Sequence, residues 1–529
     1  MKLSRRSAAV IASTVLLGLT LPASPAFAKA AKPAAKPATA KPAAAKPAAA
    51  KPAAAKPVAA KPVAAKPVVK TTTTPTRASR LAAVKTAMVI NYYPSTAGWS
   101  KMWTSFDATK VDADLAKAQA LGATGVRAII FPATFGYPAP SATYTDRLAT
   151  FVKLAAARGM TVKFTLFDWW NGYADISGST AWATAILKPY KDDARVISVE
   201  LQNEFDATNT AAVGWAKKIV PAMRSAFPTM PLTFSVDGAA GATGMAKIKT
   251  ALSAAPLDYY DYHFYGNSER ALAMIRQAQS AVSPAPIVIG EAGLNTLQNT
   301  EGEQAAFLAR VFQAADVAGV DSVAPWTLTD FAAGAIPDSS VAKIQAQYNY
   351  GLYRTNGTAK AAAAVVKAAW TNTAMPATLT DNGFENAAGL TPWRAFMPEL
   401  GLAVKTTSAA RTGKWSVTLS GTGKNSAGSP SFRVAPVTPV QPGQKWHGEV
   451  WAKGNAATGA TQIALSWFDI NDKWLGGGSS ASLPAGTTGW TKLSVDGVAP
   501  AGSASMQIHL KSGANTGTVW FDDVLVTAS

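Results

Sequence analysis

The sequence predicts an α/β protein, a (β/α)8 barrel of the TIM type followed by an all-β jelly-roll sandwich domain. Three observations carry this prediction. Short apolar runs alternate with helical patterns eight times between residues 86 and 372, which fits such a barrel in count and size. No glycine-rich phosphate loop follows the first run, which weakens the alternative of a doubly wound open sheet. From residue 378 on, short alternating strands separated by Gly, Ser and Thr replace the helical patterns.

Composition bounds the class of protein before any motif is considered. The chain has 529 residues, which is enough for two or three domains. It has no cysteine, so disulfides and thiolate metal sites are excluded. The formal charge is +19, but sixteen positive charges and no acid lie in residues 1–85, which leaves about +3 for the rest. A near-neutral globular part removes the main support for nucleic-acid binding.

The N-terminal 85 residues divide into two segments that carry no core. Residues 1–28 have a basic start, a short apolar run and small residues at Ala26-Phe27-Ala28, the pattern of a secretory signal peptide. Residues 29–85 repeat Lys-Pro every five positions from Lys41 to Lys66, so we expect an extended, disordered linker. The mature protein is therefore expected to be secreted and extracellular, with no membrane span. The basic linker is either a plain spacer or a tether to an anionic cell wall.

The predicted barrel domain covers residues 86–372. Buried strands are indicated by apolar runs at 88–91, 125–131, 160–167, 196–201, 231–236, 259–264, 286–290 and 320–326. Helices are indicated by 3.6-residue patterns at 110–121, 145–158, 181–190, 210–227, 244–252, 268–282, 301–318 and 358–370. The predicted sandwich domain covers residues 378–529, with strands at 416–419, 448–453, 462–468, 491–495, 506–510 and 519–526.

Polar side chains come at the carboxyl ends of the predicted barrel strands, where barrel enzymes carry their chemistry. The fourth strand runs out in Asn203 and Glu204, and the seventh ends in Glu291. Alternation along the fourth strand would put Glu200, Gln202 and Glu204 on one face. Taken alone, Asn203-Glu204 would equally suit a turn that caps the next helix. Two carboxylates in one cleft are what glycosidic cleavage requires, one as general acid and one as nucleophile or base.

Aromatic and polar residues surround these carboxylates at the predicted barrel mouth. Such side chains suit a neutral, polyhydroxylated substrate, because aromatic faces stack on sugar rings and polar groups bind hydroxyls. The candidates for substrate binding are Tyr92, Arg127, Asp168, Trp169, Trp170, Asn203, His263, Tyr265 and Trp326. Each has a structural alternative, such as a core role for His263 or Trp326. Glu200 and Lys163 are expected to pair inside the barrel.

On these residues the sequence resembles the clan A retaining glycoside hydrolases, most of all the family 5 cellulases and mannanases. The resemblance covers about residues 86–372. It implies that Glu204 is the acid/base and Glu291 the nucleophile. It also implies that Asn203 bonds the sugar 2-hydroxyl, and that Arg127 and Tyr265 hold and tune Glu291.

One position departs from the family pattern. Many family 5 members carry a His at the end of the third strand, where this chain has Asp168-Trp169-Trp170. The departure leaves the polysaccharide backbone open. The resemblance calls for no metal or other cofactor in the barrel, and His263, His447 and His509 are too scattered to form a ligand cluster.

The C-terminal domain resembles the jelly-roll carbohydrate-binding modules of secreted cellulases and xylanases. The resemblance runs from Asn382-Gly383-Phe384-Glu385 to the closing segment Val519–Val524. Candidates for sugar contact, at least half of which should be core, are Trp393, Trp446, Trp451, Trp467 and Trp474. The resemblance also offers Glu385 and Asp523 as oxygen ligands for a structural calcium.

The sequence thus predicts a secreted, monomeric, retaining endo-β-glycosidase that acts on cellulose, β-glucan or a mannan-like polysaccharide. The alternative from another class is a non-catalytic polysaccharide- or cell-wall-binding protein with a degenerate barrel. The presence of both Glu204 and Glu291 favours the enzyme, since the fold alone does not decide function.

Overall fold

The structure is a computed structural model of the chain. It describes residues 74–337, 340–373, 382–385, 393–396, 403–420, 431–434, 438–440, 442–469 and 473–528. The predicted signal peptide (1–28) and the linker up to residue 73 lie outside these ranges. Within them, every helix is too short or too polar to cross a membrane.

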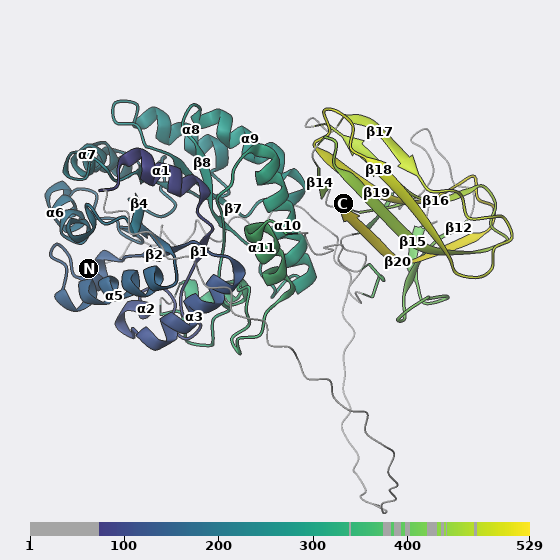
Figure 1. Ribbon diagram of the computed structural model, residues 1–529, viewed down its shortest axis with the longest axis horizontal. Coiled ribbons are helices and arrows are strands. Elements are labelled where there is room, and N and C mark those ends of the chain that lie inside the picture. The colour runs from purple at the N-terminus through teal and green to yellow at the C-terminus, as the bar shows by residue number, and fades with distance from the viewer. Residues whose placement is uncertain are drawn as a thin grey trace, which may run out of the picture. The chain divides into compact units, whose positions relative to one another are not determined.

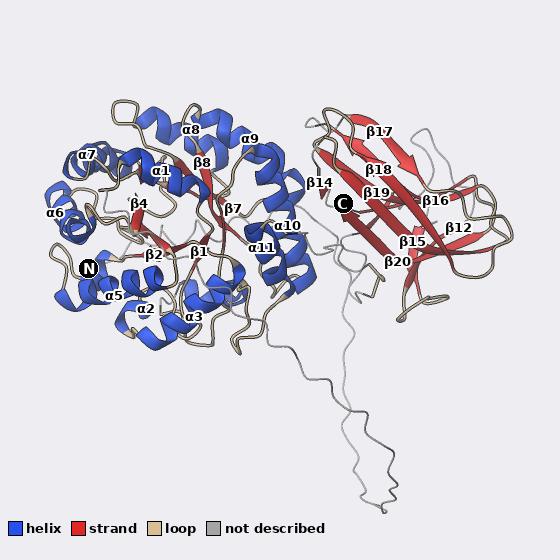
Figure 2. Cartoon of the chain, viewed as in Figure 1, coloured by secondary structure: helices blue, strands red, loops and turns tan. Residues whose placement is uncertain are grey.

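Residues 77–371 form a barrel in which helices surround the strands, as the prediction required (Figures 1 and 2). The strands are β1 (Val89–Asn91), β2 (Gly125–Ile129), β3 (Thr161–Thr165), β4 (Val196–Glu200), β5 (Leu232–Thr233), β6 (Ser235–Val236), β7 (Tyr260–Phe264), β8 (Ile287–Ala292) and β9 (Val323–Pro325). The main helices are α3 (Ala108–Leu121), α5 (Ala142–Ala157), α6 (Ile176–Leu187), α7 (Thr210–Ala226), α8 (Gly241–Ala251), α9 (Ala271–Val282), α10 (Glu301–Ala318) and α11 (Ala361–Thr371). All strand pairs in the barrel are parallel.

Capping side chains explain where several barrel helices begin. Asp107 accepts hydrogen bonds from the backbone N–H groups of Thr109 and Lys110, so α3 starts two residues earlier than the hydrophobic pattern suggested. At α10, Thr300 and Glu303 exchange hydrogen bonds in a capping box. These capping hydrogen bonds fix the starts of α3 and α10.

The barrel sheet has one break and one irregular closure. Phe234 interrupts the fifth predicted strand, which divides into β5 and β6. Between β9 and β1 the barrel is closed partly by Thr327 Oγ1, which donates to the carbonyl of Asn91 at 2.8 Å, and by the N–H of Leu328, which donates to the same carbonyl at 3.0 Å. The carboxyl ends of all strands therefore meet at one rim, where the predicted site residues lie.

Helix α1 (Arg77–Thr86) covers the opposite, amino-terminal end of the barrel. Its Val84 belongs to a buried cluster with Ile197 of β4 and Val288 of β8. The buried Arg80 donates hydrogen bonds to the backbone carbonyls of the loop before β4. The prediction of a disordered linker is therefore wrong for residues 77–85, because this segment has a buried face and packs on the barrel.

Two antiparallel sheets make up the C-terminal domain, consistent with a β-sandwich. One sheet has the order β10-β13-β19-β16-β17, with β14 also paired to β19, and the other has the order β11-β12-β20-β15-β18. The strands are β10 (Trp393–Phe396), β11 (Ala403–Thr406), β12 (Ser416–Ser420), β13 (Ser431–Val434), β14 (Thr438–Pro439), β15 (Lys445–Asn455), β16 (Ala460–Phe468), β17 (Trp474–Ser479), β18 (Thr491–Val498), β19 (Ser505–Gly513) and β20 (Thr518–Ala528). Burial alternates along β15 and β19, which places one side chain of each pair in the core.

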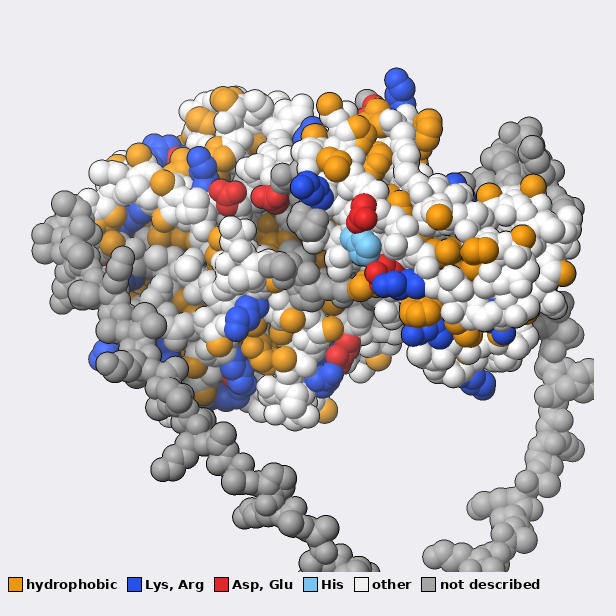
Figure 3. All heavy atoms as spheres, turned by 45° about the vertical axis from the view of Figure 1, so that its right-hand side comes forward, with side chains coloured by type: hydrophobic (Ala, Val, Ile, Leu, Met, Phe, Trp, Pro, Cys, Tyr) orange, Lys and Arg blue, Asp and Glu red, His pale blue; other side chains and the backbone are white. Residues whose placement is uncertain are grey.

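The tryptophans of this domain divide between core and surface. Trp393, Trp446 and Trp467 are buried in the core, so the idea that they contact sugar is wrong for these three. Trp474 is 62% exposed, and Trp451 lies under the Arg411 guanidinium at 3.8 Å. On the face of the molecule that Figure 3 shows, side chains of both charge signs are interspersed, which agrees with a near-neutral folded part.

Protein donors already bond the two carboxylates proposed for calcium. Glu385 accepts hydrogen bonds from the backbone N–H groups of Lys414 and Trp415. Asp523 pairs with Arg411 and accepts a hydrogen bond from Thr412 Oγ1. The calcium ligands remain a prediction.

Candidate active site

Arg127 of β2 joins the side chains at the centre of the barrel mouth. Its side chain is 1% exposed, and it forms ion pairs with Glu200 and Glu291. Its Nη2 also donates to Asn203 Oδ1 at 2.6 Å, and its Nη1 to Asn91 Oδ1 at 3.1 Å. A buried guanidinium with this many acceptors is fixed in place, and it fixes the carboxylates around it.

Glu291 of β8 is held by two donors from different strands. Arg127 Nη1 donates to Oε1, and the hydroxyl of Tyr265 donates to Oε2 at 2.6 Å. The side chain is 7% exposed. The predicted contacts of Arg127 and Tyr265 with Glu291 are thus present, and they leave the carboxylate one orientation.

Glu204 lies in the turn after β4 rather than on the strand itself. The strand ends at Glu200, and Glu204 has a φ of 45°, in the left-handed region. Side-chain alternation therefore does not extend to Glu204, which corrects the expectation that Glu200, Gln202 and Glu204 share a face. The backbone N–H of Glu204 donates to Ser235 Oγ at 2.7 Å, which holds the turn. A strained backbone that is anchored this way is typical of functional sites.

The side chains of Glu204 and Glu291 meet beside His263. One oxygen of each carboxylate and a ring nitrogen of His263 all lie within 4.8 Å of one another. His263 Nδ1 is 3.1 Å from Glu204 Oε1 and 3.5 Å from Glu291 Oε1. Among the described residues this is the group of acidic and imidazole side chains that comes closest to a metal-binding arrangement. Arg127 and Tyr265 already bond both oxygens of Glu291, so the donor set suits acid–base chemistry.

The surroundings of Glu204 and His263 shift the pKa values of both side chains. Burial raises the pKa of Glu204 above its ordinary value, His263 opposes the rise, and the nearby charge of Glu291 adds to it. Burial would lower the pKa of His263, but Glu291 and Glu204 together raise it. Glu204 is therefore poised to hold a proton next to a carboxylate that is fixed by a cation.

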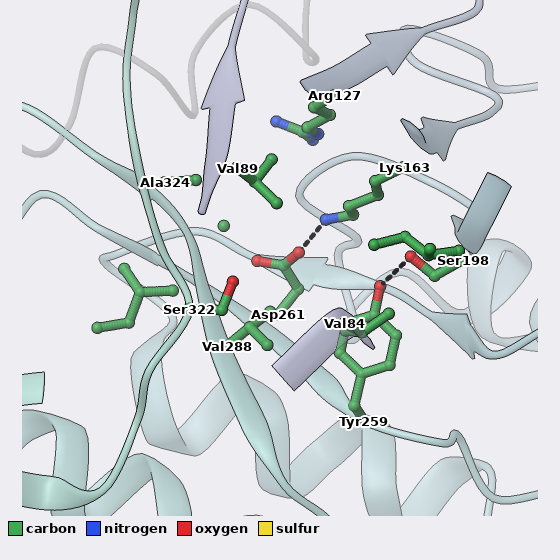
Figure 4. Close-up of a pocket in the computed structure, with 13 residues that line it drawn as sticks. Val84, Val89, Arg127, Lys163, Ser198, Tyr259, Asp261, Val288, Ser322 and Ala324 are labelled. Carbon is green, nitrogen blue, oxygen red and sulfur yellow. Dashed lines mark hydrogen bonds and ion pairs between the residues drawn. The ribbon is translucent and has the colours of Figure 1, made fainter. Parts of the chain in front are cut away.

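A charged layer lies directly below these groups, inside the barrel. Lys163 forms ion pairs with Asp261 and, at 2.9 Å, with Glu200, so the predicted pair of Lys163 and Glu200 is confirmed. Arg127, Lys163 and Asp261 line a cavity of about 20 Å³ that the barrel floor closes (Figure 4). Although burial acts in the opposite direction, Arg127 and Lys163 hold the pKa of Glu200 below its ordinary value. This layer supports Arg127 from beneath.

Aromatic residues form one wall of the mouth. Trp169 is 45% exposed and stacks on Trp99 with ring centroids 6.2 Å apart. Trp326 is mostly buried, and the edge of its ring contacts Tyr93 and Trp99. Trp99 comes from the loop after β1, and no pattern in the sequence predicted its place in the site. It contacts both Trp169 and Trp326, which are far apart in the chain.

Two residues predicted to bind substrate pack against other side chains. The hydroxyl of Tyr92 donates to Asp114 of α3 at 3.2 Å, and Tyr92 is buried against Phe151, so the structure gives its predicted role in substrate binding no support. Trp170 packs against Phe167 and Trp215, behind the mouth.

Asp168, which lies between Phe167 and Trp169 in the sequence, is only 5% exposed. Burial raises its pKa to about 7, Arg127 acts against the rise, and the neighbouring acids add to it. A carboxyl group with this pKa changes charge near neutrality.

Comparison with known families agrees with this arrangement. Residues 85–331 match the family model described as Cellulase (glycosyl hydrolase family 5). A search of the curated proteins gave no match.

Several solved structures match about half of the chain at low sequence identity. A GH5_18 protein from Streptomyces cattleya, in complex with Manb1-4GlcNAc, is 19% identical, with a TM-score of 0.46 over 54% of this chain and 80% of its own. An exo-beta-1,4-mannosidase from Opitutaceae bacterium strain TAV5 is also 19% identical, with a TM-score of 0.46 over 54% of this chain and 59% of its own. A GH5_18 protein from Bifidobacterium longum subsp. infantis is 15% identical, with a TM-score of 0.46, over 54% and 79%.

Proposed function

Because residues 85–331 match the family model of glycosyl hydrolase family 5, we propose that this protein hydrolyses a β-linked polysaccharide by double displacement, with Glu291 as nucleophile and Glu204 as acid/base. The observation that carries the proposal is the approach of the two carboxylates, whose nearest oxygens lie within 4.8 Å. Retaining glycosidases hold their two carboxyl groups about 5–5.5 Å apart, whereas inverting enzymes leave room for a water molecule between them.

The two steps follow from the positions of the side chains. In the first step, Glu291 attacks the anomeric carbon while Glu204 gives its proton to the departing glycosidic oxygen, and a glycosyl ester forms on Glu291. In the second step, Glu204 takes a proton from water, which attacks the same carbon and frees Glu291. The ester carries no negative charge, so the pKa of Glu204 falls between the steps and the acid becomes a base.

The other mouth residues serve binding and positioning. Asn203, whose Oδ1 accepts a hydrogen bond from Arg127, is proposed to bond a sugar hydroxyl next to Glu204. Arg127 and Tyr265 orient the nucleophile. Trp169 offers an exposed ring face to a sugar. We expect the reaction to need no cofactor, so that a chelator leaves the turnover number unchanged.

We further propose that the enzyme is a secreted monomer that cleaves within the chain of cellulose, β-glucan or mannan, and that the C-terminal domain binds the polymer. The family match and the paired carboxylates favour an enzyme over a non-catalytic binding protein with a degenerate barrel. The test is reducing-sugar release from purified glucan, mannan and xylan, together with viscosity. A fast loss of viscosity per bond cleaved supports cleavage within the chain, and slow loss with release of single sugars contradicts it. If none of these polymers is cleaved, these three neutral backbones are excluded as substrates.

A further inference from the structure

Two polar groups at the barrel mouth lack a protein partner among the described residues. Asp168 is 5% exposed, and its carboxylate forms no hydrogen bond or ion pair with any residue that the structure describes. The hydroxyl of Tyr93, which is 1% exposed, likewise lacks a hydrogen-bond partner among the described residues. Buried polar groups in proteins are nearly always bonded, so an unbonded pair requires an explanation.

Both groups lie at the carboxyl rim, close to the catalytic carboxylates. Tyr93 follows β1 and Asp168 follows β3. The negative charges of Asp168 and Glu291 add to the effect of burial in raising the pKa of Tyr93. The residues on both sides of Asp168, Phe167 and Trp169, have φ values of 52° and 56°. Left-handed backbone at two large residues is strained, and such strain is common at active sites and ligand-binding sites.

The aromatic wall places a flat surface next to this pair. Trp99 stacks on Tyr93 with ring centroids 5.3 Å apart, and on Trp169 at 6.2 Å. Trp169 follows Asp168 directly, and nearly half of its side chain is exposed. A sugar ring that stacks on Trp169 would therefore bring its substituents near the Asp168 carboxylate.

The balance of charge indicates which substituent the pair would bind. The buried cations of the barrel interior, Arg127 and Lys163, are already paired with Glu200, Asp261 and Glu291. No protein cation pairs with Asp168 among the described residues, although ionised carboxylates are rarely buried without one. A neutral hydroxyl would satisfy a hydrogen bond but would not favour the ionised form of Asp168 against the effect of burial. A protonated amine would satisfy both.

Resting on the proposed glycosidase function, we propose that Asp168 and the Tyr93 hydroxyl form a subsite for a sugar ammonium group, so that the enzyme prefers a β-linked polysaccharide of free amino sugars. Asp168 accepts hydrogen bonds from the ammonium group, the Tyr93 oxygen accepts another, and the sugar ring stacks on Trp169. Asp168 is then the residue that determines specificity at this subsite.

The test uses three ladders of β-1,4-linked oligosaccharides that differ at one substituent: glucose with a hydroxyl, glucosamine with an ammonium group, and N-acetylglucosamine with an amide. The full chain should give its highest kcat/KM on the glucosamine ladder. Asp168→Asn keeps the shape and removes the charge. It should lower kcat/KM on glucosamine oligomers about 10- to 100-fold, the range for a hydrogen bond to a charged group, and leave the glucose ladder little changed. Asp146→Asn, on the exposed surface of α5, is the control that loses the same charge elsewhere.

Three outcomes would overturn the inference. The first is a wild-type kcat/KM on glucosamine oligomers no higher than on glucose oligomers, a comparison that needs no variant. The second is an equal loss on every ladder in Asp168→Asn, which would make Asp168 a general hydroxyl-binding or structural residue. The third is equal affinity of glucosamine oligomers, measured by calorimetry, for the Glu204→Gln variant and for Glu204→Gln combined with Asp168→Asn. If no ladder or polymer is hydrolysed, the proposed function itself fails, which is a different result from hydrolysis of the glucose ladder alone.

Discussion

At the scale of single residues, the structure assigns different surroundings to the two glutamates. Arg127 and Tyr265 hold Glu291, whereas Glu204 is bonded to His263 and remains 24% exposed. A nucleophile must be fixed and charged, and an acid/base must exchange protons with the leaving group and with water. Because their surroundings differ, replacing Glu291 and replacing Glu204 should have different effects on turnover.

Glu291→Ala should abolish turnover even of aryl glycosides with excellent leaving groups, because no covalent intermediate can form. Glu204→Ala should lose about 10²–10⁴-fold on natural glycosides, which need a proton donor. On an activated aryl glycoside it should show a burst of aryl alcohol and then a slow steady state. Added azide should restore that turnover and yield a β-glycosyl azide, which NMR identifies. A β-azide product from Glu291→Ala, or an α-azide product from Glu204→Ala, would instead exchange the two roles.

The pH dependence should respond to His263. The raised pKa of Glu204 keeps the acid protonated to higher pH, so kcat/KM should fall only as the pH passes that raised value. His263 acts against this rise. His263→Asn should therefore move the alkaline limb of the kcat/KM profile to higher pH. The same substitution at His447, on the β-sandwich, is the control, and an unchanged or downward-shifted limb in His263→Asn would contradict the assignment.

The sequence predicted the chemistry of the site better than its geometry. The types of residue at strand ends gave Glu204, Glu291, Arg127 and Tyr265, because few other side chains suit a glycosidase. The pattern did not distinguish Tyr92 from Tyr93, since both follow a three-residue strand whose pleat is not fixed by its sequence.

Asp261 and Trp99 were missed for different reasons. Asp261 sits in an apolar strand and is paired only in space, with Lys163 of β3. Trp99 belongs to a loop, where no periodic pattern indicates which way a side chain points.

At the scale of elements, the strands were the easiest to predict and α1 the hardest. Strands buried on both faces give continuous apolar runs, which stand out in any sequence. Helix α1 closely follows a repetitive Lys-Pro-Ala segment and shares its Ala and Lys residues, so the boundary between the two was not recognised. The signal that marks its start is Thr76, whose capping box with Ser79 the structure shows.

Arg80 provides the test of whether α1 belongs to the folded domain. Its guanidinium donates to the carbonyls of Lys191 and Asp193 at 3.0 Å and to Thr229 Oγ1 at 2.8 Å. Arg80→Ala should leave these acceptors unpaired and lower the free energy of unfolding by about 2–3 kcal/mol. Lys85→Ala, an exposed change on the same helix, should lower it by less than about 0.5 kcal/mol. Calorimetry measures both, and equal melting temperatures would mean that α1 is dispensable.

At the scale of the whole molecule, composition and strand spacing were enough to predict a barrel and a β-sandwich. The exact substrate was beyond the sequence, because it depends on which loop side chains converge. The sandwich has a core of its own, in which Val450, Leu465 and Phe521 are fully buried. It is therefore expected to act as a separate binding unit.

Removal of residues 378–529 should weaken adsorption to insoluble polysaccharide while hydrolysis of short soluble chains stays within about twofold. A tethered module raises the effective concentration of the cleft at the polymer surface and takes no part in bond cleavage. Binding isotherms and initial rates on both kinds of substrate separate the two effects. Full-length Trp474→Ala, which alters an exposed ring, tests whether that surface contributes. Equal adsorption with and without the domain would exclude the binding role.

The position of α1 has a practical consequence for attaching this enzyme to a support. The helix closes the amino-terminal end of the barrel, and Glu204, Glu291 and the aromatic wall lie at the carboxyl rim. A linkage made on α1 itself, through the exposed Lys85, would thus leave the cleft facing away from the solid. An orientation of this kind lets a large, immobile polymer reach the reactive centre without a steric block from the carrier.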